Sequence, residues 1–425
     1  MKKLLVLLAM LFAMNASGQW VQISNPGTYT MSLAISGANL FAGTYDNYIS
    51  PHGAVSISTN YGTSWSQTAL NDNIVYSLLV SGPNLFAGVY GGVYLSTNNG
   101  SSWTAVNNGI SNYYITNLAI SGTNLFAGGY QPGLVCEIFL STNSGTNWTS
   151  VSSGLPYSHV NTIAVSGTNI FAGFSYDSGI RLTTNYGTNW IAVNNGLTGL
   201  TVKSIAVIGT KLFATSFNYS NNSGCGVFMS INNGTNWTSV NNNLPNLKVN
   251  TLAISGTYLI AGCDSGVYIS SNYGGNWSNI NLGFPYGTSV AMLYTTNNYL
   301  FATTTTQLNN NLWRRPISEI LGVNNINTQS PSKYSLSQNY PNPFNPVTII
   351  RFSIPAVDSR LRGNDRVLLK VYDILGKEVQ TLVNESLQPG TYETSFDGSS
   401  LTSGVYFYKL ITNEFTETKK MLLIK

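Results

Sequence analysis

One octapeptide recurs along the chain, and this repetition restricts the possible folds more than any other feature. Ser58–Trp65 reads STNYGTSW, and five variants follow at tryptophan spacings of 38, 45, 42, 47 and 40 residues. A second marker, close to SGxNLFAG, occurs seven times, with its aromatic or aliphatic position at Phe41, Phe86, Phe126, Phe171, Phe213, Ile260 and Phe301. Units of this length cannot bury their faces alone, so the pattern predicts a repeat architecture of the β-propeller kind.

Each unit reads as four short strands. In the second unit we expect strands over residues 75–81, 84–89, 92–96 and 103–106, because apolar residues alternate there with small or polar ones. In the turn between the last two strands, Asn98 is expected to accept a hydrogen bond from a backbone N–H two residues on. Gly100 is expected to supply a positive φ, and Trp103 to bury its ring against the sheet.

These octapeptides resemble the Asp-box (BNR) repeat, SxDxGxxW, with Asn at the Asp position in all six copies. Asparagine keeps the turn geometry but removes the charge. The resemblance implies that the boxes are structural and lie on the face opposite any active site. The positions concerned are Asn60, Gly62, Trp65, Asn98, Gly100, Trp103, Asn143, Gly145, Trp148, Asn185, Gly187, Trp190, Asn232, Gly234, Trp237, Asn272, Gly274 and Trp277.

The seventh unit has three expected strands but no box strand of its own. The segment Trp20–Ser24 looks like the fourth strand of the other units. We therefore predict an all-β, seven-bladed β-propeller over residues 19–321, whose N-terminal strand closes the last blade and removes the open edge. A propeller of six or eight blades is the alternative.

The N-terminus reads as a secretory signal peptide over residues 1–18. Two lysines precede an 11-residue apolar run, and small residues follow at the expected cleavage site before Gln19. The run is too short to span about 30 Å of hydrocarbon, and we expect no transmembrane segment. There are three cysteines, so at least one has no partner within the chain, and whether Cys225 and Cys263 pair stays open.

After a polar linker over residues 322–333, alternating strands separated by glycine turns predict a small immunoglobulin-like β-sandwich over residues 334–425. This region resembles the C-terminal sorting domain of type IX secretion cargo, through NYPNPFNP (Asn339–Pro346), YDILG (Tyr372–Gly376), SGVY (Ser403–Tyr406) and the terminal lysine. The resemblance implies that Gly404, Val405, Tyr406 and Lys425 belong to the sorting signal. It also implies contact with the secretion machinery and export through the periplasm and outer membrane, to the cell surface or beyond.

Charge excludes several functions. Only 8% of residues are charged, against about 25% in ordinary proteins, and residues 19–328 hold six basic and six acidic residues. Nucleic-acid binding needs a basic stripe, which is missing. A sialidase needs three converging arginines, but among Arg181, Arg314 and Arg315 two are adjacent in one expected strand and point to opposite faces.

Candidate site residues lie in the loops that face away from the boxes. Weak catalytic candidates are Asp46, Asp177 and Asp264, because a glycosidase needs two carboxylates across a cleft. His52 and His159 have no metal-ligand spacing, and we expect neither a metal nor another cofactor. Aromatic residues that could bind a ligand are Tyr45, Tyr48, Tyr90, Tyr130, Tyr157, Tyr176 and Tyr286, and Tyr113, Tyr114, Phe217 and Tyr219 belong to the same face.

We therefore expect a secreted or cell-surface propeller that binds an extracellular glycan or protein without catalysis. A polysaccharide-degrading glycoside hydrolase or lyase of Asp-box type is the alternative, and an extracellular assembly scaffold is a third possibility. The tyrosine-rich loops fit either ligand class, since tyrosine is favoured at protein interfaces and sugar rings stack on aromatic faces.

Overall fold

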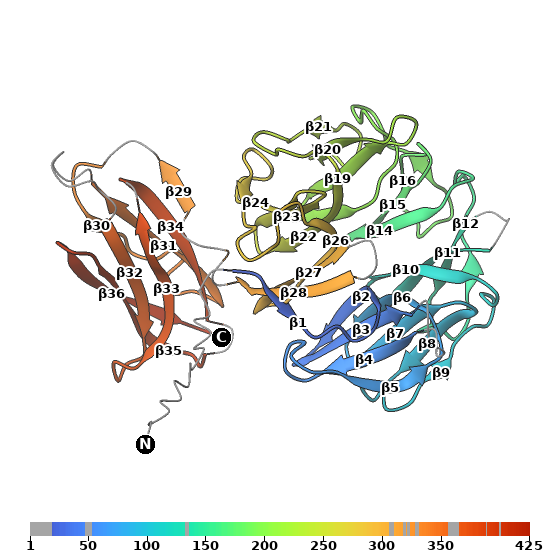
Figure 1. Cartoon of the computed structure of the whole chain (residues 1–425), viewed down its shortest axis with the longest axis horizontal. Helices are drawn as coiled ribbons and strands as arrows, with labels where there is room; N and C mark the ends of the chain where they lie inside the picture. The colour runs from blue at the N-terminus through green and yellow to red at the C-terminus, as the bar shows by residue number, and fades with distance from the viewer. Residues whose placement is uncertain are drawn as a thin grey trace, which may run out of the picture. The chain divides into compact units, whose positions relative to one another are not determined.

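The computed structural model describes residues 19–46, 53–131, 136–305, 310–317, 320, 324–327, 331–355, 365–387, 389–398 and 401–425. The predicted signal peptide, Tyr48 and His52 lie outside these ranges. Every regular element longer than one turn in the described residues is a strand, β1 to β36 (Figure 1). The chain divides between Pro316 and Ile317 into two compact units.

The described part of the first unit contains seven four-stranded antiparallel sheets. Six of them are formed by consecutive strands: β2 (Tyr29–Ser36), β3 (Asn39–Tyr45), β4 (Ala54–Ser58) and β5 (Ser66–Asn71); β6 (Val75–Ser81), β7 (Asn84–Val89), β8 (Gly92–Ser96) and β9 (Thr104–Ala105); β10 (Tyr114–Ser121), β11 (Asn124–Tyr130), β12 (Cys136–Ser141) and β13 (Thr149–Ser150); β14 (Val160–Ser166), β15 (Asn169–Phe174), β16 (Ile180–Thr183) and β17 (Ile191–Ala192); β18 (Ile205–Ile208), β19 (Lys211–Asn218), β20 (Ser223–Ser230) and β21 (Thr238–Ser239); β22 (Val249–Ser255), β23 (Tyr258–Cys263), β24 (Gly266–Ser270) and β25 (Ser278–Asn279).

The remaining sheet joins the two ends of this unit. It consists of β26 (Ser289–Thr295), β27 (Tyr299–Thr305), β28 (Asn310–Pro316) and the N-terminal β1 (Val21–Ile23). β1 pairs antiparallel with β28, with Gln22 opposite Trp313. The N-terminal segment thus takes the place of the fourth strand that the seventh repeat lacks.

The first strands of the seven sheets contact one another in sequence. β2 contacts β6, and contacts continue through β10, β14, β18 and β22 to β26, which in turn contacts β2. Figure 1 shows the sheets of this unit side by side around a common centre. Each sheet therefore packs between two neighbours, as expected for units that cannot bury their faces alone.

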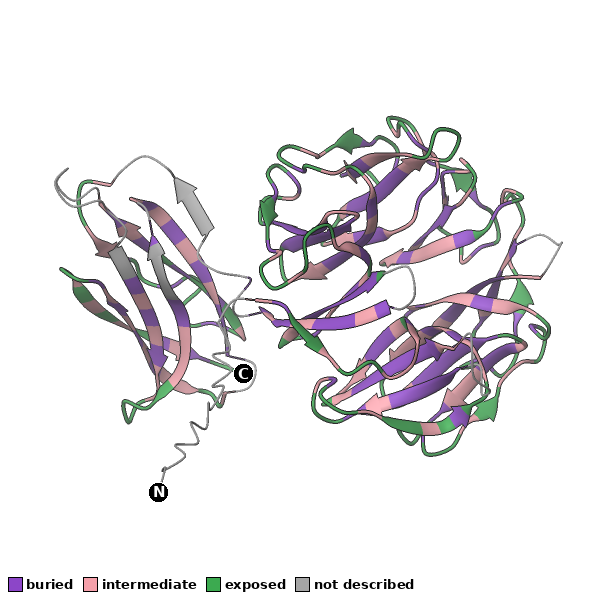
Figure 2. Ribbon diagram, viewed as in Figure 1, coloured by how far each residue is buried: buried purple, intermediate pink, exposed green. Residues whose placement is uncertain are grey.

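The second strand of each sheet is the most deeply buried element, as Figure 2 shows in purple. In β3 and β7, Phe41 and Phe86 are at most 1% exposed, because neighbouring sheets cover both faces. A Cβ at Gly43 would lie 2.6 Å from a Val75 methyl group of the next sheet, so the marker needs glycine there. The repeated marker is therefore the packing layer between sheets.

Seven tryptophans link each sheet to the one before it. The indole Nε1 of Trp237, for example, donates to the Val193 carbonyl oxygen at 2.9 Å. Trp20 acts as the seventh member and donates to the Ile280 carbonyl at 2.7 Å. The others are Trp65, Trp148, Trp190 and Trp277, which donate to backbone carbonyls, and Trp103, which donates to the Thr68 hydroxyl. Buried indole N–H groups need such partners.

The box turns differ in one detail from the expected Asx turn. Asn98 Oδ1 accepts from the backbone N–H of Ser102, four residues on, at 2.9 Å. The buried Ser96 hydroxyl donates to the same oxygen and accepts from the Gly100 N–H. Gly100 has φ +83°, as expected, and Asn99 before it is also left-handed at +55°. Two successive left-handed residues widen the turn, and this places Oδ1 near Ser102 and not two residues on.

The three cysteines are free thiols. Cys225 lies in the third strand of its sheet and Cys263 in the second strand of the next. Burial raises the pKa of the Cys263 thiol to about 12, with a further contribution from the Asp264 charge. The two cysteines occupy different strand positions, and the possible pairing between them is not found.

The second unit contains two further four-stranded antiparallel sheets in its described part. One has the order β29 (Asn324–Asn327), β34 (Gly390–Asp397), β31 (Val347–Ile354) and β30 (Ser335–Leu336); the other has the order β33 (Glu378–Leu387), β32 (Asp365–Tyr372), β35 (Gly404–Ile411) and β36 (Thr416–Leu423). Their buried residues, including Phe352, Val371 and Leu410, form one hydrophobic core.

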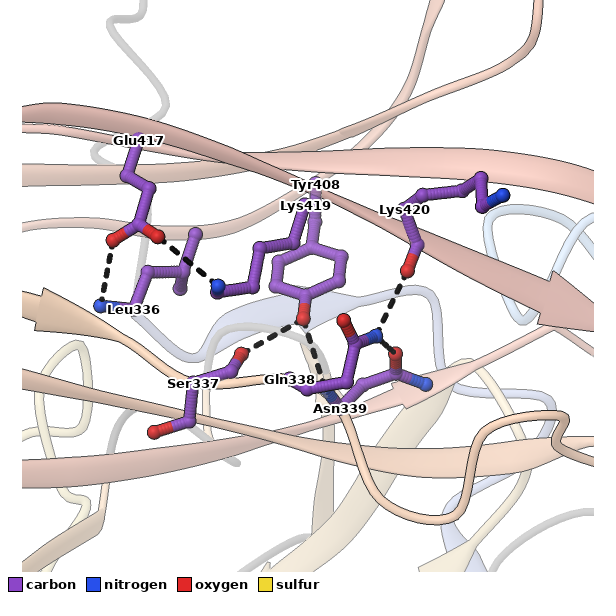
Figure 3. Close-up of polar contacts among 8 residues, drawn as sticks. All are labelled: Leu336, Ser337, Gln338, Asn339, Tyr408, Glu417, Lys419 and Lys420. Atoms are coloured by element: carbon purple, nitrogen blue, oxygen red, sulfur yellow. Dashed lines mark hydrogen bonds and ion pairs between the residues drawn. The ribbon is translucent and has the colours of Figure 1, made fainter.

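A short segment at β30 is held to the second sheet by polar contacts (Figure 3). The buried Tyr408 hydroxyl donates to the Ser337 carbonyl and accepts from the Asn339 N–H, each at 2.8 Å. Burial raises the pKa of Tyr408 to about 12. Glu417 accepts from the Leu336 N–H at 3.1 Å. The uncharged Tyr408 phenol therefore links the two sheets through its two hydrogen bonds.

Candidate binding face of the first unit

One end of the first unit collects aromatic side chains. Tyr45 and Tyr130 end the second strands of their sheets, and Tyr90, Tyr176 and Tyr219 follow such strands by one or two residues. The box turns connect the third and fourth strands, so they lie at the opposite end of each sheet. Strand direction alone therefore places these tyrosines on the end away from the boxes.

Six rings form a continuous aromatic row across four consecutive sheets. The row consists of Tyr90, Tyr114, Tyr130, His159, Tyr176 and Tyr219. Successive ring centroids lie 4.5, 5.1, 4.9, 5.5 and 5.0 Å apart. Tyr114 and Tyr130 lie directly opposite each other in the pairing of β10 with β11, which explains their stacking.

Tyr114 and Tyr130 are less exposed than the other rings of the aromatic row. Tyr90, Tyr176 and Tyr219 are about half exposed, at 52%, 49% and 56%. Tyr130 stacks on both Tyr114 and His159, with interplanar angles of 15° and 10°. Burial and the neighbouring Tyr114 raise the pKa of Tyr130. Tyr130 thus offers its edge and hydroxyl group more than a free face.

A polar pocket adjoins the row. It has a volume of about 380 Å³ and is lined by Lys203, Asn250, Asp264, Ser289, Ala291 and Thr305. Lys203 Nζ donates to Asn250 Oδ1 at 2.8 Å, and Asn250 Nδ2 donates to Asp264 Oδ1 at 2.9 Å. The Ser289 hydroxyl donates to the same oxygen of Asp264 at 3.0 Å. Burial lowers the pKa of Lys203, whose ammonium lies 4.9 Å from the Phe217 ring centroid.

A second pocket of about 510 Å³ lies beside the sixth sheet. Ser265, Tyr268, Asn281, Phe284 and the fully exposed Tyr286 are among its lining residues. Tyr286 belongs to the predicted ligand residues, but it is not part of the aromatic row. Tyr157 is likewise exposed outside the row. Tyr45 stacks on Tyr29, 5.8 Å away, within the first sheet.

The three candidate carboxylates are held by separate local contacts. Asp46 accepts from the Thr28 N–H at 2.6 Å. Asp177 accepts from the Thr201 hydroxyl and the Tyr219 N–H, each at 3.2 Å. Asp264 belongs to the polar pocket. Among the hydrogen bonds of the described residues, no partner is shared between any two of these carboxylates. Asp46 and Asp177 therefore stabilise their own loops through these hydrogen bonds.

The arginines have structural partners. Arg314 Nη1 donates to the Tyr61 carbonyl at 2.7 Å, and Arg315 Nη1 to the Ile280 carbonyl at 2.8 Å. Arg181 donates to the carbonyls of Ser178 and Ile180. Within the described residues, no group of three or more His, Cys, Asp or Glu side chains could hold a metal ion.

Sequence reasoning missed Tyr76, Lys203, Asn250 and Ser289. Burial raises the pKa of Tyr76 to about 12, and the ring lies 5.9 Å from that of Tyr114. Lys203, Tyr76 and Asn250 each follow the buried valine near the start of a first strand. A lysine at this position, in a segment otherwise made of small and apolar residues, is the signal that could have located the pocket.

The predicted sorting residues lie at one end of the hairpin β35–β36. Gly404 pairs with Leu423, and the Lys425 N–H donates to the Ser403 hydroxyl at 3.0 Å. The buried Tyr406 donates to the Thr402 carbonyl at 2.8 Å. The chain terminus and the SGVY segment are thus joined in one local structure.

Residues 338–425 match the family of secretion system C-terminal sorting domains. The chain carries a type IX sorting tail. It is therefore a cargo protein that export takes through the periplasm and outer membrane to the cell surface or the extracellular space. In the described residues, no helix is long and apolar enough to cross a membrane. No curated protein matches the chain.

Similar solved structures share the fold of the first unit. A structure titled "YCF48 bound to D1 peptide" is 14% identical, covers 70% of this chain and 96% of its own, and has a TM-score of 0.51. A chain of a mitotic checkpoint complex is also 14% identical, with coverages of 70% and 91% and a TM-score of 0.51. The Pan2 WD40 domain of Neurospora crassa is 10% identical, with coverages of 71% and 96% and a TM-score of 0.49. Together with the seven four-stranded sheets, the first two of these likenesses identify the first unit as a propeller-like all-β fold.

Proposed function

We propose that residues 19–321 form a seven-bladed β-propeller of Asp-box type, followed by an immunoglobulin-like sorting domain over 334–425. The segment 322–333, expected to be a polar linker, differs from that expectation, because its residues 324–327 form β29, which pairs with β34. Seven four-stranded sheets, the cyclic contacts of their first strands and seven linking tryptophans support this architecture. The six box turns share one hydrogen-bond pattern, with Asn in place of the family's Asp.

We propose further that the propeller is a non-catalytic binding module for an extracellular glycan or protein. The aromatic row carries this proposal, because six rings gather at the end of the unit that the boxes leave unused. Tyrosine offers large contact area and a hydroxyl at low entropic cost. The separate bracing of Asp46 and Asp177 supports a binding role over the paired carboxylates of a glycosidase.

The test uses the purified chain over residues 19–425. Immobilised protein is exposed to extracellular proteins and soluble polysaccharides of the producing organism's surroundings, and binding is recorded together with release of reducing ends. We expect binding without release, and loss of binding in the double variant Tyr130→Ala/Tyr176→Ala. Release of reducing ends would contradict the non-catalytic role and direct attention to Asp264.

A further inference from the structure

The geometry of the aromatic row points to a particular class of ligand, on the basis of the binding role proposed above. We propose that the face binds an extended polypeptide segment, with one amide group of that segment held in the polar pocket between Lys203 and Asp264. Two observations carry this inference: the orientation of the rings, and the pairing of a donor with an acceptor in the pocket.

Ring orientation distinguishes the two ligand classes. A sugar ring stacks on a free aromatic face, and rings that stack on one another use up those faces. Tyr130 stacks on Tyr114 and on His159, with centroid distances of 5.1 and 4.9 Å. Tyr176 meets its two neighbours edge to face, at 75° and 84°. Tyr130 therefore presents its ring edge and hydroxyl group, and the half-exposed Tyr90, Tyr176 and Tyr219 add hydroxyl groups that suit backbone amides.

The polar pocket contains both a hydrogen-bond donor, Lys203, and a hydrogen-bond acceptor, Asp264. Lys203 has three N–H donors, of which one is directed to Asn250. Among the hydrogen bonds of the described residues, those that Asp264 accepts from Asn250 and Ser289 both use Oδ1, and none uses its second oxygen. A charged ligand would be attracted by one group and repelled by the other. An amide satisfies both, because its carbonyl accepts from Lys203 and its N–H donates to Asp264.

Phe217 and Tyr219 connect the pocket to the row through the end of β19. Phe217, over which the Lys203 ammonium lies, is in β19, and Tyr219 follows two residues later as the last ring of the row. The last ring of the row is therefore two residues along the chain from the ring that the pocket's lysine contacts. Polypeptides repeat the amide at every residue, whereas a sugar chain carries it only as an N-acetyl group. This repetition favours the polypeptide.

The experiment pans a phage-displayed library of random dodecapeptides on immobilised residues 19–425. Enriched sequences are made as synthetic peptides, and their affinities are measured by calorimetry. Chitohexaose and soluble xyloglucan are tested in parallel, as sugar chains with and without an amide. We expect peptides that bind the wild type, and weakening by about tenfold or more in Lys203→Met and Asp264→Asn, from the loss of a hydrogen bond to a charged group.

Matched controls lie at the other end of the same sheet. Lys211 also stands over an aromatic ring, that of Tyr273, at 4.6 Å. Lys211→Met and Tyr273→Ala should leave peptide affinity unchanged, whereas Tyr219→Ala should weaken it. Tryptophan fluorescence during unfolding verifies that each variant is folded. If Lys203→Met is unstable, Asp264→Asn alone tests the role of the pocket.

The outcomes separate this inference from the proposed function. Binding of chitohexaose or xyloglucan without peptide enrichment would overturn the polypeptide ligand and support a glycan-binding module. Enriched peptides that are indifferent to the Lys203 and Asp264 variants would overturn the role of the pocket. Failure of all probes to bind would count against both the polypeptide and the binding face.

Discussion

Trp20 offers the sharpest test of how the first unit is closed. Its ring is 2% exposed and stacks on Phe284 with a centroid distance of 4.6 Å. Its indole donates to the Ile280 carbonyl, and its backbone N–H donates to the Leu282 carbonyl at 2.7 Å. We predict that Trp20→Ala destabilises the first unit as strongly as a core substitution, although the residue lies near the chain's N-terminus.

The magnitude follows from the contacts. Replacing a buried tryptophan by alanine costs about 3–5 kcal/mol. Trp20→Phe should cost only about 1 kcal/mol, because Arg315 also donates to the Ile280 carbonyl at 2.8 Å and keeps it satisfied. Trp237→Phe should cost more, up to about 3 kcal/mol, because the indole is the hydrogen-bond donor that the structure gives to the Val193 carbonyl.

The assay is guanidinium unfolding followed by tryptophan fluorescence. All eight tryptophans lie in the first unit, so the signal reports on this unit without interference from the sorting domain. The expected order of destabilisation is Trp20→Ala, then Trp237→Phe, then Trp20→Phe. If Trp20→Ala shifts the unfolding free energy by no more than about 0.5 kcal/mol, as at an ordinary surface site, β1 does not close the unit.

Three further predictions follow from single residues or segments. Gly100→Ala should destabilise more than Gly122→Ala in the same fluorescence assay. Both glycines have positive φ, but a Cβ at Gly100 would lie 2.7 Å from the Thr68 methyl, whereas Gly122 has open space. Tyr408→Phe should cost about 1–3 kcal/mol at pH 8 by circular dichroism. The raised pKa of Tyr408 stabilises the neutral phenol, so this difference should shrink as pH rises from about 10 toward 12; a pH-independent difference would contradict it. Deleting residues 338–425, which match the sorting family, should keep the protein inside the producing cell, as immunoblots of medium and periplasm would reveal.

The sequence predicted the repeating unit well, because its signals are local. Strand alternation and glycine-bounded turns located the four strands of the second repeat, β6 to β9, to within two residues. The resemblance of Trp20–Ser24 to other fourth strands located the pairing partner of β28. The box turn was predicted only in part, because nothing in STNNGSSW indicates that Asn99 adopts a left-handed conformation or that Ser96 supplies a buried hydroxyl.

The arrangement of the candidate face was predicted less completely, because it depends on contacts between repeats. Loop position identified Tyr90, Tyr130 and Tyr176, but their stacking order depends on how neighbouring sheets are rotated. Lys203 and Asp264 lie 61 positions apart in different sheets, and only the folded unit brings them to one pocket. Their separation in the sequence could not have shown that these two residues lie in the same pocket.

The two ends of the propeller-like unit differ in how much the repeats vary, and this difference favours the end away from the boxes as the proposed binding face. At one end, six copies of the box keep Asn, Gly and Trp at fixed positions, since each closes the same hydrogen-bonded turn. At the other end, the position four residues after the aromatic or aliphatic marker residue differs between repeats: it is Tyr45, Tyr90, Tyr130, Ser175, Phe217, Asp264 and Thr305. A purely structural role would favour the same solution in every repeat. Different side chains at equivalent positions break the symmetry of the unit, and a ligand that is not itself symmetric requires that break.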